Sequence, residues 1–359
     1  MFGVRSSSQS APGAQPQSRG KDSTAKLETP AFDPRSVFKG PLYDLGEDSP
    51  AFSGILAPEA ERGSEKVGIS EGFLENAAEY HARHTSGDVE GYTNLYKDLL
   101  TTAGVQNWSG KNILDIGAGS GSNTTIPLAR LFTESTIIST DLSPQLLSIL
   151  QHQLRVLPER PNVACVCMDA MNDFIIPDSM DVVVGGAILH HLLEPIKAIQ
   201  VARKVLKEGG VAVFSEPYEY GHLVLGSTLR QILALQDKLG ALKPEVANFF
   251  SVHVSEWMHR AGRHHNPEYF INMDDKWLFT RQYMREMALR AGFKDVQIIS
   301  LTPKPTFVKY TEANLQYLGE NVSELLPEWA WEMIRELDRT ITDELKDELL
   351  FFAATIFKA

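Results

Sequence analysis

A short apolar run, Ile113 to Ile116, is followed at once by glycines at every second position, Gly117, Gly119 and Gly121. Glycine is required where a backbone turns sharply or approaches a ligand too closely for a Cβ atom. A strand, a glycine-rich turn and a helix in this order are typical of Rossmann-like α/β domains. The dinucleotide fingerprint would place its third glycine at Ser122, so the spacing favours a different nucleoside ligand.

Alternating strand and helix patterns continue through the following hundred residues. Ser143 is expected to cap a helix that begins at Pro144, and an apolar stripe from Pro195 to Leu206 indicates another. Alternation at this spacing predicts a mostly parallel sheet with helices on both faces. Seven strands are expected in all, near residues 113–116, 135–140, 163–168, 180–185, 211–215, 296–301 and 349–357.

The chain outside this core divides by composition. Residues 1–66 are rich in Ser, Gln, Pro, Gly and Ala, and offer too little apolar surface to offset ordering entropy, which predicts a disordered tail. The further segments expected are N-terminal cap helices at 67–104, the Rossmann-like core at 105–217, a helical lid insertion at 218–278, a core helix and strand at 279–310, a second helical insertion at 311–346 and a terminal core strand at 347–359.

Composition restricts the location and the partners of the chain. No apolar run approaches the roughly 20 residues of a membrane helix, and the N-terminus lacks the apolar stretch of a secretory signal. We therefore expect a cytoplasmic protein without a membrane span; three basic residues before the first acidic one only weakly suggest a transit peptide. The net charge of −12 makes nucleic acid a poor substrate.

No metal site is expected from the cysteines or the clustered histidines. Cys165 and Cys167 lie two apart in a predicted buried strand, and a metal site needs more ligands than this pair supplies. His259, His264 and His265 have a spacing that fits no familiar metal site. We interpret the cysteines as small buried hydrophobic side chains and the histidine loop as solvated.

Acidic residues and histidines stand where successive strands are expected to end. Asp141 follows the second strand, where a carboxylate can accept hydrogen bonds from both hydroxyls of a ribose. Asp169 follows the third strand, in a position to accept a hydrogen bond from an adenine amino group. His190 and His191 follow the fourth strand. The carboxyl ends of parallel strands share one edge of a sheet, which is where ligands bind.

Together these motifs resemble those of class I S-adenosylmethionine (SAM)-dependent methyltransferases, in particular the small-molecule, type 11/12-like branch that includes quinone-biosynthesis enzymes. The matching motifs cover about residues 105–217 and 279–301. They are Asp-Ile-Gly-Ala-Gly-Ser-Gly at 115–121, the strand end at Asp141, Asp169-Ala170, Leu-His-His-Leu-Leu-Glu-Pro at 189–195, Leu-Lys-Glu-Gly-Gly-Val at 206–211 and Ala-Gly-Phe at 291–293.

The resemblance implies SAM as cofactor and assigns roles by position. The glycines would line its methionine and ribose portion, Asp141 would bind the ribose hydroxyls, Asp169 the adenine, and Asp115 would lie near the cofactor's amino group. A carboxylate at Asp115 that merely caps the strand end is the alternative. The full set of cofactor-binding residues expected is Asp115, Gly117, Ala118, Gly119, Gly121, Asp141, Leu142, Asp169 and Ala170.

SAM already carries an electrophilic methyl group, so the protein mainly has to align an acceptor with it. A hydroxyl acceptor also needs a base, and His190 or His191 is placed to act as one or to position the substrate. Alternatively, both histidines simply begin the next helix. Glu216, after the fifth strand, is a third catalytic candidate.

The expected function is methyl transfer from SAM to a small-molecule acceptor. Leu, Phe and Trp are abundant in the two insertions. They could line a pocket for an aromatic or lipid-like acceptor, form the ordinary core of a helical cap, or form the interface of a homodimer. The sequence alone does not distinguish these three uses. Methylation of a protein or glycan is an alternative of the same class. A catalytically inactive SAM-binding partner is an alternative of a different class.

Overall fold

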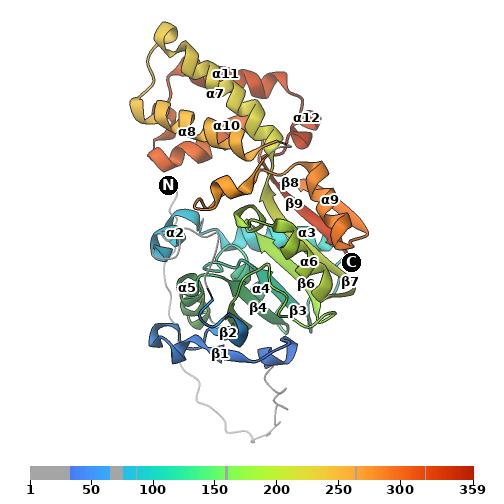
Figure 1. The fold of residues 1–359 in the computed structure, drawn as a ribbon. Helices are drawn as coiled ribbons and strands as arrows, with labels where there is room; N and C mark the ends of the chain where they lie inside the picture. Colours follow the sequence, from blue (N-terminus) through green and yellow to red (C-terminus); the bar gives the residue numbers. More distant parts are fainter. Residues whose placement is uncertain (1–32, 65–75, 86, 158–160, 263–264, 320) are drawn as a thin grey trace, which may run out of the picture. The chain divides into compact units, whose positions relative to one another are not determined.

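A mixed nine-stranded sheet forms the centre of the described chain (Figure 1). The computed structural model describes residues 33–64, 76–85, 87–157, 161–262, 265–319 and 321–359. Residues 34–359 form one unit, and the first 32 residues of the predicted tail lie outside the described ranges. None of the described helices is long and apolar enough to cross a membrane.

Seven of the strands are those expected from the sequence. Five of them run parallel to one another, and the terminal strand lies antiparallel between its two neighbours. In spatial order they are β5 (Asn162–Cys167), β4 (Thr136–Asp141), β3 (Asn112–Ile116), β6 (Met180–Gly186), β7 (Leu206–Pro217), β9 (Phe352–Lys358) and β8 (Asp295–Ser300).

Two further strands extend the sheet beyond β5. β1 (Leu42–Asp44) pairs with β2 (Leu56–Pro58), and β2 pairs with β5. The prediction of disorder was therefore wrong for residues 34–64, and the expected strand count of seven was too low. The reason is that the few apolar residues of this segment are well placed: Tyr43 and Ile55 pack in a buried cluster with the side chains of Leu147 and Cys165.

Helices begin and end at the residues that their sequence signals indicate. α5 (Pro144–Arg155) is capped by the Ser143 hydroxyl, which accepts the N–H of Leu146. α9 (Arg281–Ala291) ends at Gly292 in the left-handed conformation. The other helices around the sheet are α2 (Ala77–His84), α3 (Val89–Ala103), α4 (Thr125–Leu131) and α6 (Pro195–Val205). Residues of α3 and α4 share one buried cluster with β3, β6, β7 and β9.

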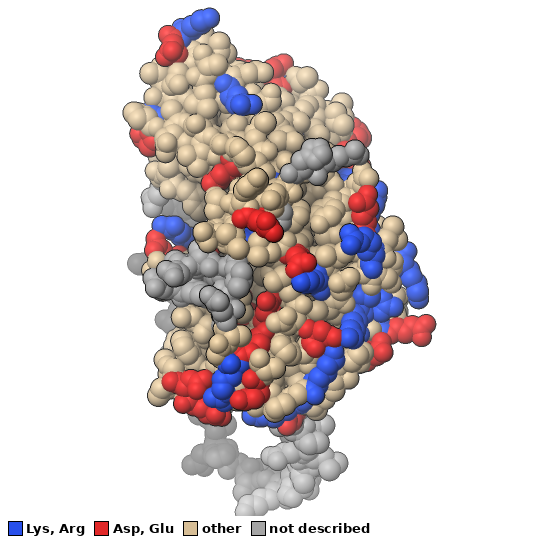
Figure 2. Space-filling view, viewed as in Figure 1, with Lys and Arg blue, Asp and Glu red and all other residues tan. Residues whose placement is uncertain are grey.

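The two insertions form a helical cap with its own core, seen at the top of Figure 1. Phe250, Trp257, Phe307 and Trp331 belong to one buried cluster, so most apolar residues of the insertions pack against each other. The cap contains α7 (Glu219–Leu239), α8 (Pro244–Arg260), α10 (Thr306–Leu315), α11 (Glu328–Thr340) and α12 (Asp343–Glu348). On the face drawn in Figure 2, Lys and Arg lie interspersed with Asp and Glu.

Candidate functional site

The glycine turn follows β3 at the point where the strand order of the sheet reverses. β4 and β5 lie on one side of β3, and β6 and β7 lie on the other. In open α/β sheets such a switch point leaves a crevice outside the carboxyl ends of the strands, and ligands bind there. The helix α2 covers this turn, since the Nδ1 of His81 lies 2.7 Å from the Ser120 hydroxyl and the Asn123 amide donates to the His84 carbonyl at 2.9 Å.

The three glycines of the turn serve two different purposes. All have positive φ, 69°, 54° and 77° for Gly117, Gly119 and Gly121. A Cβ on Gly117 would stand 2.5 Å from Ile188, and one on Gly121 would stand 2.2 Å from Leu150, so close packing excludes side chains there. A Cβ on Gly119 would meet no atom within 4 Å. Gly119 therefore leaves space for something other than the protein.

Asp141 ties the glycine turn to the end of the neighbouring strand. Its Oδ2 accepts the N–H of Gly119 at 2.8 Å, and its Oδ1 accepts the N–H of Ser143 at 2.8 Å. The carboxylate therefore stands beside Gly119 at the switch point.

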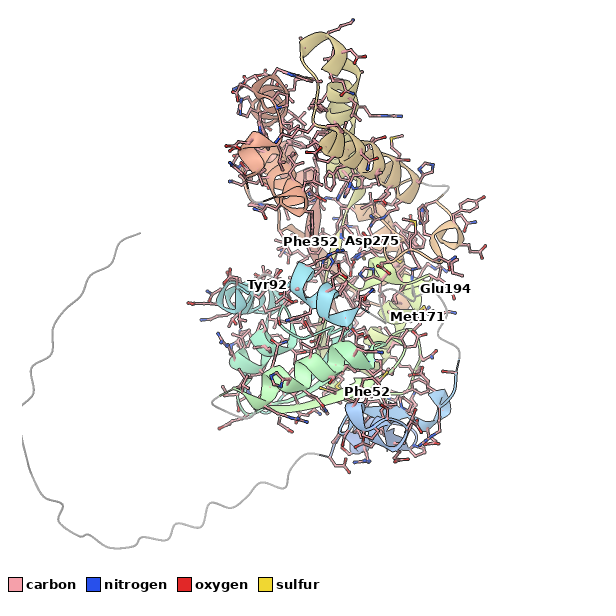
Figure 3. All side chains as sticks on the ribbon, turned by 90° about the vertical axis from the view of Figure 1, so that its left-hand side faces the viewer. Phe52, Tyr92, Met171, Glu194, Asp275 and Phe352 are labelled. Carbon is pink, nitrogen blue, oxygen red and sulfur yellow. The ribbon has the colours of Figure 1, made fainter. Side chains whose placement is uncertain are left out.

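A single cavity of about 870 Å³ joins this turn to the helical cap. Its lining includes Gly119 and Asp141 at one end, and Trp257 and Tyr310 of the cap at the other. Ligand pockets range from about 300 to 1,000 Å³, so this one lies near the upper limit. Figure 3 labels three lining residues that come from distant parts of the chain, Tyr92, Asp275 and Phe352.

The structure brings together part of the expected cofactor set. Gly117, Ala118, Gly119, Gly121 and Asp141 line the cavity. Four other expected residues are not part of that lining, namely Asp115, Leu142, Asp169 and Ala170.

Asp169 is occupied by local contacts at the end of β5. Its Oδ1 accepts the N–H of Met171 at 2.8 Å, and its own N–H donates to the Glu61 carboxylate at 3.3 Å. Glu61 also accepts the Asn172 amide at 2.7 Å. Glu61 belongs to the segment that was expected to be disordered, so sequence reasoning did not find this contact.

Asp115 lies completely buried in β3, where its Oδ2 accepts the Thr125 hydroxyl at 2.6 Å. Burial raises the pKa of this carboxyl to about 6, although the Thr125 hydrogen bond opposes the change. The side chain thus fixes the start of α4 behind the glycine turn. That position agrees with the structural alternative considered for Asp115.

Replacing Asp115 by Asn is expected to alter how stability depends on pH. A raised folded-state pKa means that ionisation penalises the folded state as pH rises from about 4 through 6. Between pH 4 and pH 8 the wild type should therefore lose roughly 2 kcal/mol relative to Asp115→Asn. Urea unfolding at both pH values measures this difference, and a difference that does not change with pH would refute the assignment.

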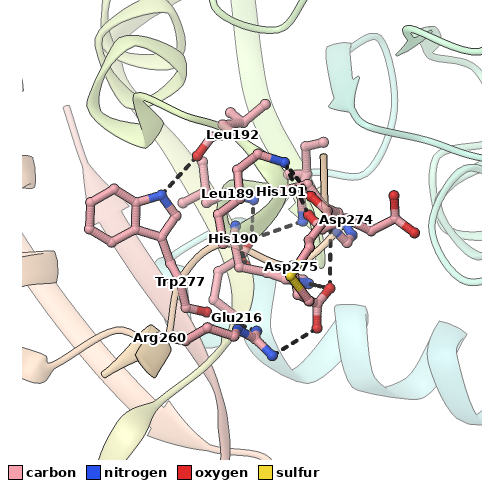
Figure 4. Close-up of polar contacts among 12 residues, drawn as sticks. Leu189, His190, His191, Leu192, Glu216, Arg260, Asp274, Asp275 and Trp277 are labelled. Atoms are coloured by element: carbon pink, nitrogen blue, oxygen red, sulfur yellow. Dashed lines mark hydrogen bonds and ion pairs between the residues drawn. The ribbon is translucent and has the colours of Figure 1, made fainter. Parts of the chain in front are cut away.

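Glu216 holds the turn that follows β6 (Figure 4). Its Oε1 accepts the N–H groups of Ile188 at 3.0 Å and Leu189 at 2.7 Å. Its Oε2 accepts the N–H of His190 at 3.2 Å and also the Nδ1–H of the same residue at 2.7 Å. The carboxylate is completely buried and outside the cavity lining, so it acts on the site through His190.

His190 lies between two carboxylates. Its Nε2 is 3.4 Å from the Oδ1 of Asp275, on the side opposite Glu216, and Arg260 pairs with the Oδ2 of Asp275 at 3.0 Å. Burial alone would lower the pKa of His190, but Asp275 and Glu216 raise it to about 9. Burial would likewise raise the pKa of Asp275, yet His190 and Arg260 hold it well below its ordinary value.

His191 differs from its neighbour in protonation. Its Nδ1–H donates to the Asp274 carbonyl at 2.9 Å, and burial together with the charge of His190 lowers its pKa to about 3. Completely buried Lys276 fixes the loop around Asp274. Its Nζ donates to the Met273 carbonyl at 2.7 Å, and its backbone N–H donates to the His190 carbonyl at 2.7 Å. The two histidines thus belong to a short 3-10 helix, Leu189–His191, and are also held by contacts to an insertion loop.

Sequence reasoning missed Arg260, Trp257 and Asp275. Two of these residues stand in sequence patterns that are common on protein surfaces. Asp275 belongs to an acidic pair followed by a lysine, and Arg260 stands at the end of a helix. Nothing in their spacing along the chain connects them with His190, and the fold alone brings them together.

Residues 114–214 match the model of a family described as a methyltransferase domain. A comparison with curated proteins gives no match.

Solved structures with similar folds are distant in sequence. Phosphoethanolamine N-methyltransferase 2 of Haemonchus contortus is 18% identical with a TM-score of 0.43, covering 74% of this chain and 52% of its own. The present chain thus spans about half the length of that relative. The CurJ carbon methyltransferase is 14% identical with a TM-score of 0.45, covering 80% of this chain and 60% of its own. The YcgJ protein of Bacillus subtilis is 15% identical with a TM-score of 0.43, covering 75% of this chain and 98% of its own. Such distant likenesses say nothing about a substrate.

Proposed function

We propose that the enzyme transfers a methyl group from SAM to a small-molecule acceptor bound beneath the helical cap, in keeping with the match of residues 114–214 to a methyltransferase domain. The observation that carries this proposal is the single cavity shared by the glycine turn and the cap. Methyl transfer needs the acceptor in line with the methyl–sulfur bond and shielded from water. A cavity that reaches from Gly119 to Trp257 would let the cofactor and an acceptor lie side by side.

The cofactor would occupy the sheet end of the cavity. Gly119 would let the backbone approach SAM, and the Asp141 carboxylate beside it would accept hydrogen bonds from the ribose hydroxyls. Gly117, Ala118 and Gly121 would shape the same turn. Asp169 stays assigned to the adenine, and Leu142 and Ala170 stay in the cofactor-binding set, by their positions after β4 and β5. Asp115 would act indirectly, through Thr125 and the start of α4.

The acceptor would occupy the cap end, beside His190 and His191. Both histidines line the cavity, and Phe249, Trp257 and Tyr310 supply aromatic surface there. This composition favours an acceptor with an apolar or aromatic part and a polar group that meets the histidines. Glu216 would be a positioning residue, since it contacts His190 and is shielded from the cavity.

Transfer of labelled methyl groups tests the proposal directly. The protein would be incubated with labelled SAM and either a panel of small aromatic and amphipathic acceptors or a fraction of native proteins and glycans. Product in the small-molecule reactions alone is expected. Label in the macromolecular fraction alone would contradict the proposal, and no transfer to any acceptor would favour an inactive SAM-binding protein.

Tyr317 offers a matched test of the acceptor end. It lines the cavity from the cap and is 60% exposed, so Tyr317→Ala should not disturb folding. Losing its aromatic contact is expected to raise the KM of the acceptor about tenfold, with unchanged binding of S-adenosylhomocysteine (SAH). Tyr269→Ala serves as control, because Tyr269 is exposed and outside the cavity lining. Equal effects of both variants would place the acceptor elsewhere.

A further inference from the structure

We infer that His190, His191 and Asp275 form a binding site for a divalent transition-metal ion. Each offers one ligand atom, and the three atoms lie within 4.8 Å of one another. Two imidazoles and one carboxylate are a ligand set that suits Zn²⁺ and other borderline-soft divalent metals. Catalytic metal sites commonly have three protein ligands and keep a position open for water or substrate.

The closest pair of ligand atoms already has a suitable separation. The Nε2 of His190 is 3.4 Å from the Oδ1 of Asp275. Zn²⁺ bonds of about 2.0–2.1 Å in a tetrahedron place neighbouring ligands about 3.4 Å apart. The third ligand, His191, has its Nδ1 3.4 Å from the same Oδ1. In this structure the same Nδ1 donates to the Asp274 carbonyl at 2.9 Å, so coordination of an ion by His191 would replace that hydrogen bond.

The surroundings of the three residues have the form of a metal site's outer shell. Metal-binding histidines usually donate their other ring N–H to a carboxylate or carbonyl, which fixes the tautomer and the ring orientation. Glu216 accepts the Nδ1–H of His190 at 2.7 Å and so directs the Nε2 toward Asp275. Arg260 pairs with the Oδ2 of Asp275 at 3.0 Å, which orients the Oδ1 toward His190.

The ion would face the acceptor end of the cavity, because all three ligand residues belong to its lining. An acceptor that bears oxygen atoms, such as a carboxylate or a hydroxyl beside a carbonyl, could therefore complete the coordination. This use of the ion rests on the proposed function, whereas binding of the metal does not.

Calorimetric titration of Zn²⁺ into EDTA-treated, dialysed protein tests the inference. One Zn²⁺ per chain is expected with a Kd below about 10 μM. Asp275→Asn should weaken this binding at least tenfold, and Glu216→Gln should weaken it about 10–100-fold through the orientation of His190. Glu256→Gln is the matched control, since Glu256 is a carboxylate of the same cavity lining outside the cluster.

SAH titrated into the same samples shows whether each variant is folded and whether the proposed function stands. Loss of Zn²⁺ binding in Asp275→Asn with retained SAH binding supports the metal site. Absence of Zn²⁺ binding to the wild type, or equal Zn²⁺ affinity of the wild type and Asp275→Asn, would overturn it. Failure of the wild type to bind SAH would instead count against the proposed function, whatever the result with Zn²⁺.

Discussion

Gly119→Ala is expected to abolish SAH binding and methyl transfer while the protein stays folded. The added methyl group would meet no protein atom within 4 Å, so no clash opposes folding. An alanine at a φ of 54° carries about 1 kcal/mol of backbone strain, which a folded domain normally tolerates. The methyl group would occupy space that the cofactor needs. Calorimetry with SAH and thermal melting measure the two properties.

Gly110→Ala is the control that separates two effects of Gly119→Ala, the loss of space for the cofactor and the backbone strain. Gly110 has a similar φ of 66°, an added Cβ there also meets nothing within 4 Å, and the residue lies outside the cavity lining. Both variants should melt at similar temperatures, and Gly110→Ala should bind SAH like the wild type. Full SAH affinity in Gly119→Ala would show that the cofactor does not approach this turn.

Glu216→Ala is expected to lower the melting temperature by about 10 °C. The substitution leaves three backbone N–H groups and the His190 ring without their acceptor in a completely buried place. Breaking a buried pair of this kind costs about 3–5 kcal/mol, and 1 kcal/mol corresponds to roughly 2–4 °C in a chain of this size. Calorimetric melting is the measurement.

Glu219→Ala provides a comparison for the effect of removing a buried carboxylate. Glu219 is also buried, and among the described residues it accepts one backbone N–H, that of Gly262 at 2.9 Å. Its replacement should cost about 1–3 kcal/mol. Equal melting temperatures for Glu216→Ala and Glu219→Ala would show that Glu216 does not hold the turn after β6.

The core of the fold could be predicted because its signals are local. Strand and helix periodicity, Ser143 as a cap, Gly292 as a helix end and the turn from Gly117 to Gly121 each depend on neighbouring residues. The strands β1 and β2 could not be predicted this way. They are three residues long each, and only their packing against α5 and β5 makes them favourable.

The site was predicted less completely than the fold, for the same physical reason. His190 and His191 could be located from the end of a predicted strand, whereas their protonation depends on Asp275 and Glu216, which distant elements bring to them. Likewise, Asp115 holds the start of α4 because its buried carboxylate accepts the Thr125 hydroxyl, and neither the burial nor this contact can be seen in the sequence. Long-range contacts of this kind leave no pattern in a single sequence.

The central claim is that SAM binds at the glycine turn, and titration of SAH into the wild type and Asp141→Ala tests it most directly. Micromolar binding to the wild type is expected, with affinity at least a hundredfold lower in the variant, because two charge-assisted hydrogen bonds are worth about 3 kcal/mol or more. A melting curve of Asp141→Ala verifies that it is folded. SAH binding of equal strength to both proteins, or no binding to the wild type, would contradict the account.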